Sequence, residues 1–167
     1  MELTRPLICL AAALLLAGCA HDAAKPETTP AAPVAPTPSS DKPAGLFEII
    51  STSEVATFFD AHSVALYQGK PQLRQFSLIN NYAKPAKIGS GETWVRSSSS
   101  LRVIDCEQGK TAQFGRVYFT EYFAKGEEVL RKDEVPRWEA VLQQSMLGQL
   151  RTMVCGLDPA RLRGAGN

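Results

Sequence analysis

After Gly45 the sequence breaks into short apolar segments separated by turn-forming residues. These segments are residues 46–50, 55–59, 63–67, 73–79, 93–106, 112–123 and 127–130. Several of the connections between them, such as residues 68–71 and 108–109, contain Gly or Pro and are too short to hold a crossover helix. Consecutive strands with such connections favour an antiparallel meander over a parallel sheet.

The segment 112–123 shows the two-residue period of a strand most clearly. One face is predicted to carry Gly115, Val117, Phe119, Glu121 and Phe123, and the other Phe114, Arg116, Tyr118, Thr120 and Tyr122. The first set is expected to face the core. The second mixes aromatic rings with an arginine, which indicates a partly exposed surface or one that covers a partner. In the preceding segment Ile104 and Cys106 point the same way, so the cysteine is expected near a buried face.

One helix is predicted, near the end of the chain. Ser145 is a suitable N-cap, and Gly156 is placed to end the helix in a left-handed conformation. An apolar stripe at helical spacing is expected to pack on the sheet, and it consists of Met146, Leu147, Leu150, Met153 and Val154. Cys155 lies about 140° from the centre of this stripe at ~100° per residue, so it reaches a strand only where the helix ends. The predicted fold class is therefore α+β, an antiparallel meander with one C-terminal helix packed on it.

The N-terminus has the pattern of an export signal. Arg5 precedes an apolar run over residues 7–17 that is too short to cross a bilayer as a stable helix, which predicts a signal peptide over residues 1–18. The signal ends in Leu-Ala-Gly followed by Cys19, which resembles the lipobox of bacterial lipoproteins. The resemblance implies cleavage before Cys19 and acylation of that cysteine, with chains such as palmitate. The alternative is an ordinary signal peptide with a chance cysteine.

The sorting rules of bacterial lipoproteins then indicate in which membrane the protein is anchored. An aspartate after the acylated cysteine commonly signals retention in the inner membrane of Gram-negative bacteria, and here Ala20 follows instead. We therefore expect a lipid anchor in the outer membrane of the cell envelope, with the domain on either the surface or the periplasmic side. Several acyl chains hold a protein firmly, since each buried CH₂ contributes ~0.8 kcal/mol.

Residues 19–44 are rich in Pro, Ala, Thr and Ser and hold too little apolar surface to order themselves. Their prolines favour extended conformers, which predicts a semi-rigid tether of up to ~3.1 Å per residue. A Pro-rich ligand for another protein is the alternative. The folded domain is expected over residues 45–158, and a loose polar tail over residues 159–167.

Only two of the four cysteines remain available for a disulfide after this processing. Cys9 leaves with the signal peptide and Cys19 carries lipid, so Cys106 and Cys155 remain. In an exported protein such a pair is expected to be joined, and a loop of about fifty residues gives ~4 kcal/mol in the chain-entropy model. A reactive thiol pair is the alternative. The spacing is not that of a CxxC redox centre, and two cysteines without nearby histidines do not form a zinc site.

An ordered set of motifs carries a family resemblance. The set comprises Phe58-Phe59-Asp60, Ser63-Val64, the strand 73–79, the serines 97–100, Ile104-Asp105-Cys106, the aromatic strand 117–119, Trp138, Ser145 and Cys155. Over roughly residues 50–157 the chain thus resembles the surface-adhesin protein E family. The resemblance implies an antiparallel sheet whose C-terminal helix is fastened by a bridge between Cys106 and Cys155. It also implies a surface lipoprotein that binds host matrix or serum proteins.

Catalysis has little support in the sequence. The only histidines are His21, in the tether, and His62, beside Asp60, which removes most nucleophile–base schemes. The serines 97–100 lack a nucleophile-elbow context and are expected at a polar strand edge. The charge is balanced, with 18 Lys and Arg against 17 Asp and Glu, so nothing calls for nucleic acid. We expect no enzyme, no cofactor and no metal site.

Protein binding is the favoured function. A polar loop is predicted over residues 80–87, and its side chains join those of the aromatic strand in a candidate surface made of Tyr82, Lys84, Lys87, Arg116, Tyr118 and Tyr122. Trp94, close behind the loop, and the tyrosines either join this surface or cap a small core. The ligand is expected to be a host matrix or serum protein. The alternative is a periplasm-facing lipoprotein that binds another bacterial protein during envelope assembly. An open sheet edge also allows a homodimer.

Overall fold

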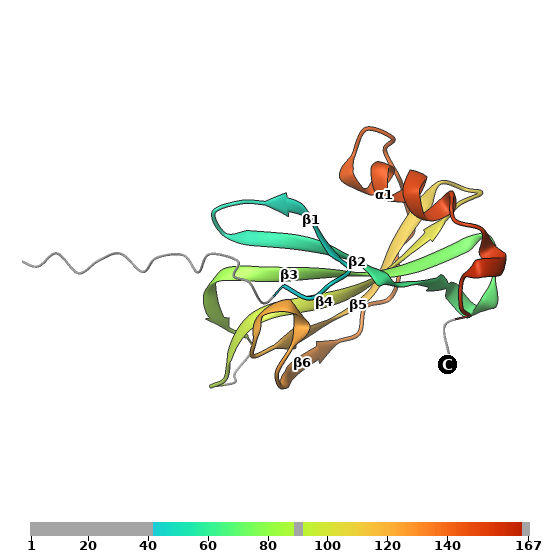
Figure 1. The fold of residues 1–167 in the computed structure, drawn as a ribbon. Helices are drawn as coiled ribbons and strands as arrows, with labels where there is room; N and C mark the ends of the chain where they lie inside the picture. Colours follow the sequence, from blue (N-terminus) through green and yellow to red (C-terminus); the bar gives the residue numbers. More distant parts are fainter. Residues whose placement is uncertain (1–41, 89–91, 165–167) are drawn as a thin grey trace, which may run out of the picture. The chain divides into compact units, whose positions relative to one another are not determined.

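The computed structural model describes residues 42–88 and 92–164 of the 167-residue chain. The predicted signal peptide, Cys19 and most of the tether lie outside these residues. Within them the strands form one antiparallel sheet in the order β1-β2-β3-β4-β5-β6, and β7 pairs with β5 (Figure 1). None of the helices in this part of the chain is long and apolar enough to cross a membrane.

The strands are β1 (Leu46–Ser51), β2 (Val55–Leu66), β3 (Leu73–Lys87), β4 (Trp94–Asp105), β5 (Lys110–Phe119), β6 (Glu128–Lys132) and β7 (Glu139–Ala140). One α-helix, α1 (Met146–Cys155), follows them. Three short 3₁₀ turns complete the fold, at Tyr67–Gly69, Tyr122–Ala124 and Pro159–Arg161. The predicted α+β meander with a C-terminal helix is confirmed, and β7 departs from the meander by pairing with β5.

The sheet has apolar clusters on both faces. Phe58 and Phe59 are neighbours on β2 and therefore point to opposite faces. Phe59 joins a cluster with Phe76, Leu78 and Ile104, and α1 covers this cluster with Leu150 and Val154; we call this the helix face. Phe58 joins a second cluster with Leu46, Ile79 and Phe123, the last from the turn Tyr122–Ala124; we call this the opposite face.

Strand β2 is continuous, so the prediction of two strands over residues 55–59 and 63–67 is wrong. Its register with β3 shifts between Asp60 and Ala65. At the shift the Asp60 carboxylate accepts the backbone N–H of His62 at 2.9 Å, and the Ser63 hydroxyl donates to the Asp60 carbonyl at 2.6 Å. The same hydroxyl accepts the N–H of Ser77 on β3 at 2.7 Å. The Ser63 hydroxyl thus takes the place of a backbone acceptor in the hydrogen-bond ladder between β2 and β3. Strand β2 therefore continues through residues that locally favour a turn.

Strand β3 is also longer than predicted, because residues 80–87 belong to it and are not a loop. Its asparagine side chains have specific partners across the sheet. Asn80 accepts from the Thr57 hydroxyl at 2.8 Å, and buried Asn81 accepts the N–H of Phe123 at 2.8 Å. Beyond them the strand bulges and re-pairs at Ala86. The proline within this bulge has no N–H to give to a ladder.

Strand β5 contains a bulge that corrects the predicted faces. Ser100 pairs with Arg116, whereas Arg102 pairs with Gln113, so β5 has one residue more than β4 between these pairs. The extra residue places Phe114 and Arg116 on opposite faces, although the sequence predicts one face for both. Gly115 occupies the bulge with φ 129°, and a Cβ there would lie 2.8 Å from the Lys132 carbonyl oxygen. The strand ends at Phe119 and does not run on to residue 123.

The serines of β4 are central and largely buried, so the expectation of a polar strand edge is wrong. Ser97 and Ser98 are fully buried and Ser100 nearly so. The Ser97 hydroxyl donates to the Glu121 carbonyl and accepts the N–H of Ala124 at 3.0 Å. A small side chain with both hydrogen-bonding roles thus lets the turn Tyr122–Ala124 pack closely on the sheet.

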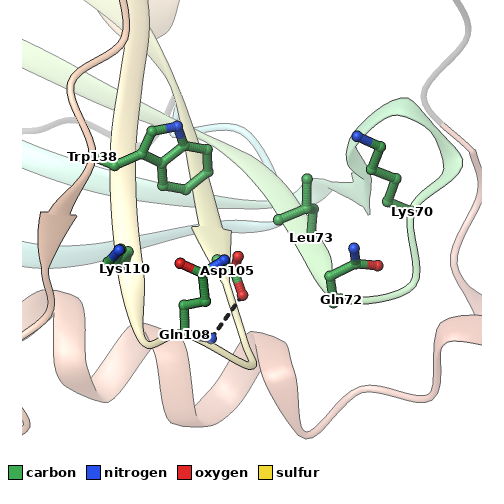
Figure 2. A pocket seen from close by; sticks show the side chains of 7 residues that line it. All are labelled: Lys70, Gln72, Leu73, Asp105, Gln108, Lys110 and Trp138. Atoms are coloured by element: carbon green, nitrogen blue, oxygen red, sulfur yellow. Dashed lines mark hydrogen bonds between the residues drawn. The ribbon is translucent and has the colours of Figure 1, made fainter.

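The far end of the sheet carries a row of three residues in register. Leu73 on β3 pairs with Asp105 on β4, which pairs with Lys110 on β5 (Figure 2). The Asp105 carboxylate caps the β4–β5 turn, since its Oδ1 accepts the N–H groups of Glu107 at 3.0 Å and Gln108 at 2.8 Å. This cap fixes the position of the next residue after β4, Cys106.

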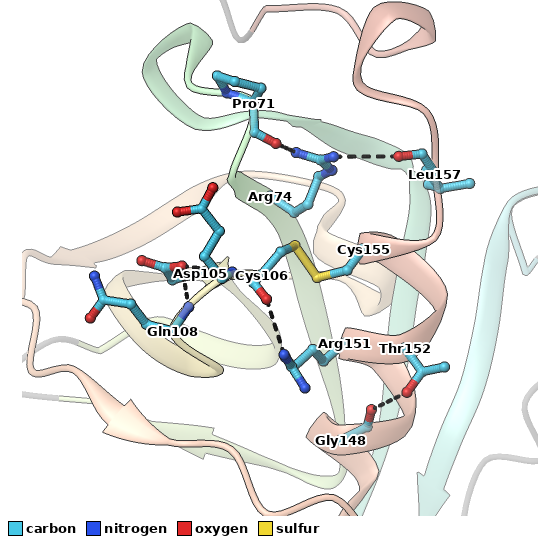
Figure 3. The surroundings of a disulfide bond; sticks show 11 residues. Pro71, Arg74, Asp105, Cys106, Gln108, Gly148, Arg151, Thr152, Cys155 and Leu157 are labelled. Atoms are coloured by element: carbon cyan, nitrogen blue, oxygen red, sulfur yellow. Dashed lines mark hydrogen bonds between the residues drawn. A yellow bond between two sulfur atoms is a disulfide. The ribbon is translucent and has the colours of Figure 1, made fainter.

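The bridge between Cys106 and Cys155 joins the end of β4 to the last residue of α1 across 49 positions (Figure 3). Both cysteines pack against the cluster of the helix face, which confirms the predicted pairing and burial. Ser145 caps α1 by accepting the N–H of Gly148 at 3.1 Å, as predicted. Gly156 is right-handed at φ −73°, so the predicted left-handed end is wrong; its N–H donates to the Thr152 carbonyl and extends the helical pattern.

Two arginines tie the helix end to the sheet beside the bridge (Figure 3). Arg151 donates to the Cys106 carbonyl at 3.0 Å, and Arg74, which is 2% exposed, donates to the Leu157 carbonyl at 3.3 Å. The chain then pairs with β2, where the N–H of Leu66 donates to the Arg163 carbonyl at 3.0 Å. The segment up to residue 164 is therefore attached to the sheet, in contrast to the expected loose tail.

Candidate protein-binding site

A cavity of about 590 Å³ opens beside the bulge of β3. Three of the predicted surface residues line it, Tyr82 and Lys84 from the bulge and Tyr118 from β5. The other lining residues are Ser53, Glu54, Ala83, Ala86 and Ile88. The connection between β1 and β2 thus faces the bulge of β3 across the cavity, and the sheet brings together residues that are far apart in the sequence.

The two tyrosines meet over β4 because that strand carries serine beneath them. The Tyr82 hydroxyl forms a hydrogen bond with the Ser98 hydroxyl at 2.7 Å, and Ser98 pairs directly with Tyr118. A larger side chain in place of Ser98 would occupy the space between the rings. The buried serine run therefore has a second role, which is to leave room for an aromatic wall.

Positive charge surrounds this aromatic wall. Arg116 lies two residues before Tyr118 on the same face, and the Lys132 ammonium on β6 lies 5.8 Å from the Tyr118 ring centroid. Burial raises the pKa of the Tyr118 hydroxyl, and the Arg116 guanidinium opposes part of this rise. The hydroxyl is therefore neutral at physiological pH and can both donate and accept a hydrogen bond.

The remaining two predicted residues lie elsewhere. Lys87 forms an ion pair with Glu92 at the end of the β3–β4 hairpin, 5.4 Å from the Trp94 ring centroid. Trp94 is 54% exposed, so it does not cap the core. Tyr122 packs against the cluster of the opposite face, beneath the Arg96 guanidinium at 5.7 Å. The cavity and its rim thus hold Tyr82, Lys84, Arg116 and Tyr118, which together we call the binding face.

Sequence reasoning missed two contributors to the site, Lys132 and Glu54. Lys132 reaches Tyr118 because β6 pairs with β5. The Lys125-Gly126 turn signal predicts a hairpin there, and pairing its two strands would have placed residues 128–132 beside Tyr118. Glu54 had no local signal, since its position depends on how the β1–β2 connection meets the bulge of β3.

The chemistry of the cavity suits recognition of another surface. Tyrosine and arginine are enriched at protein interfaces, where a rigid ring and a planar cation give large contact areas at low entropic cost. Within residues 42–88 and 92–164, no three His, Cys, Asp or Glu side chains are grouped to hold a metal ion. His62 is exposed on β2 and is not among the residues that line the cavity.

Known proteins share the fold and the sequence pattern of this chain. A family model described as surface-adhesin protein E matches residues 46–156. Two solved structures of protein E from Haemophilus influenzae are similar. One, from a non-typeable strain, has a TM-score of 0.63 and 16% identity over 77% of this chain and 86% of that one. The other has a TM-score of 0.62 and 15% identity over 75% of this chain and 95% of that one. Since the family model covers more than half of the sequence, the chain belongs to the surface-adhesin protein E family.

Proposed function

We propose that the protein is an outer-membrane lipoprotein, anchored through Cys19, that presents its domain outside the cell and binds a host matrix or serum protein. Membership of a surface-adhesin family supports the adhesin role. The observation that carries the binding site is the convergence of Tyr82, Lys84 and Tyr118 on one open cavity. We assign the domain no catalytic role.

The binding face suits a partly apolar segment of the partner that carries charges of both signs. Lys84 and Lys132 are exposed, and Arg116 adds a third cation on the same side of the sheet. Glu54 lines the cavity as well, and Glu134 acts on the Tyr118 hydroxyl, so these cations stand beside carboxylates. The hydroxyls of Tyr82 and Tyr118 supply hydrogen bonds within a ring-lined wall.

We expect a Tyr118→Ala variant to bind its partner with a free energy weakened by about 2 kcal/mol, the usual loss at an interface hot spot. A Lys84→Gln variant is expected to slow association mainly, since exposed rim charges act on the encounter. Binding of the purified protein to immobilised laminin and vitronectin, followed by surface plasmon resonance, measures both.

Tyr122→Ala is the matched control, because Tyr122 is a tyrosine outside the cavity. After correction for any loss of folded protein, this control should bind as the unmodified protein does. Equal losses for Tyr118→Ala and Tyr122→Ala would remove the cavity from the proposal while leaving the adhesin role open. Failure of the unmodified protein to bind either surface would count against these two matrix and serum partners.

A homodimer through β1 is a further part of the proposal. β1 is the edge strand of the sheet, and its Phe47 and Ile50 side chains are 59% and 40% exposed. An exposed apolar edge strand readily pairs with another strand. Sedimentation velocity of the protein in detergent measures this directly, and a monomer at all accessible concentrations would exclude the dimer.

A further inference from the structure

A second cavity, of about 370 Å³, lies at the far end of the sheet on the opposite face (Figure 2). Leu73, Asp105 and Lys110 line it as neighbours in one row across three strands. Ile104, next to Asp105, points to the helix face and packs there with α1, so the row points away from the helix. Lys70 and Trp138 belong to the same lining and come from the β2–β3 connection and the segment before β7.

Asp105 supplies a fixed acceptor in this cavity. The residue is 8% exposed, and the two backbone N–H groups bound to Oδ1 hold its carboxylate in one orientation. In the part of the chain that the structure describes, no side chain forms an ion pair with it. A carboxylate that is held in place and not paired with a cation is a good acceptor for hydroxyl donors of a ligand.

The cations of the cavity are similarly unpaired. Neither Lys70 nor Lys110 forms an ion pair with another described residue, although both line the same cavity as Asp105. Two ammonium groups against one carboxylate leave a net positive charge, which favours a ligand that carries one anionic group. Gln72, in the same lining, offers an amide that both donates and accepts.

Trp138 provides an ordered apolar wall. Its ring meets Phe114 edge-on, with centroids 6.2 Å apart and planes at 80°, and Phe114 in turn contacts Tyr67 at 5.0 Å. The bulge at Gly115 is what turns Phe114 to this face. Trp138 remains 39% exposed, so part of a fixed indole surface is free for a ligand. Indole surfaces stack well on the C–H faces of sugar rings, which are apolar while the ring edges carry hydroxyls.

We propose that this cavity binds a saccharide bearing a carboxylate. The ring would stack on Trp138, its carboxylate would meet Lys70 and Lys110, and its hydroxyls would donate to Asp105 and exchange hydrogen bonds with Gln72. An inorganic anion would use neither the indole nor the Asp105 carboxylate, and an acidic peptide has no hydroxyl-bearing ring that could lie on the indole and donate to Asp105. A uronic acid and a sialic acid share the chemistry required. The site uses no residue of the binding face and is a second recognition site beyond the proposed function.

Tryptophan fluorescence tests the assignment. The chain has two tryptophans, so a Trp94→Phe background leaves Trp138 as the sole reporter. This protein, purified as the full chain in detergent, is titrated with glucuronic acid, N-acetylneuraminic acid, glucose and a short glutamate peptide. We expect a saturable change in emission with at least one of the two acids, and a much weaker one with neutral glucose. Which of the two acids binds distinguishes a uronic acid from a sialic acid as the ligand.

A charge variant in the same background makes the test specific. Lys70→Gln/Lys110→Gln is expected to weaken binding of the acid at least tenfold, the effect of losing charge-assisted hydrogen bonds. Both lysines are exposed, so the variant should unfold at the same urea midpoint. Lys84→Gln, at the other cavity, is the matched control and should bind the acid unchanged. An absence of saturable binding, equal binding of glucose, equal binding of a short glutamate peptide, or an unaffected charge variant would each overturn the proposal.

Discussion

A Cys106→Ser/Cys155→Ser variant is expected to lose about 4 kcal/mol of unfolding free energy. The bridge closes a loop of 49 positions that begins just after β4 and contains β5, β6, β7 and the helix. Without it the unfolded chain regains the entropy of that loop. The helix end is then held by apolar contacts of Leu150 and Val154 and by the hydrogen bonds of Arg74 and Arg151.

Urea unfolding of the oxidised and the reduced protein measures this loss. Reductant should lower the stability of the unmodified protein to that of the double variant, and it should leave the variant unchanged. This control separates loss of the bridge from the small packing change of replacing sulfur by oxygen. If the variant were as stable as the oxidised protein, the account of the bridge as the main fastening of α1 would be wrong.

Replacing Gly115 by alanine is expected to cost about 3 kcal/mol, at the upper end of the range for a strained backbone. At φ 129° an L-residue is disfavoured whatever surrounds it, and the new Cβ would lie 2.8 Å from the Lys132 carbonyl oxygen. The strands β5 and β6 would have to move apart. Because the bulge at Gly115 also sets the side of Phe114, the emission of Trp138 should change when the same replacement is made in the Trp94→Phe background.

Gly69→Ala is the matched control for this prediction. Gly69 also has a positive φ, of 69°, but a Cβ there would meet no atom within 4 Å. Its replacement should cost only the left-handed backbone penalty, about 1 kcal/mol. Urea midpoints of the two variants give the difference. Equal losses at the two positions would show that the close approach of Lys132 does not determine the need for glycine at 115.

The features that were predicted correctly depend on short-range patterns. The alternation of apolar residues predicts the meander, and Ser145 with its apolar stripe predicts α1. The cysteine pairing followed from exclusion of the other two cysteines and is present in the structure. Tyr82, Lys84 and Tyr118 were predicted as one surface and do line one cavity, because the meander brings β3 and β5 to either side of β4.

The features that were missed depend on partners distant in the sequence. Ser63 keeps β2 continuous by bonding to Ser77, and Asn81 extends β3 by bonding to Phe123. The position of Phe114 depends on an extra residue in β5, which only the pairing with β4 reveals. Tyr122 was placed on the surface by an alternation that ends at Phe119, where the chain turns back over the sheet. Local propensity at these positions favours a turn or a regular strand, and the tertiary contacts override it.

Protease treatment of intact cells determines whether the domain is presented outside the cell. The domain is followed with an antibody against residues 45–158. A periplasmic protein must persist, which shows that the envelope is intact, and lysed cells must lose the domain, which shows that the protease can cut it. Our account predicts that the domain disappears from intact cells together with known surface proteins. Its persistence in intact cells and loss in lysed cells would contradict the adhesin role and place the domain in the periplasm.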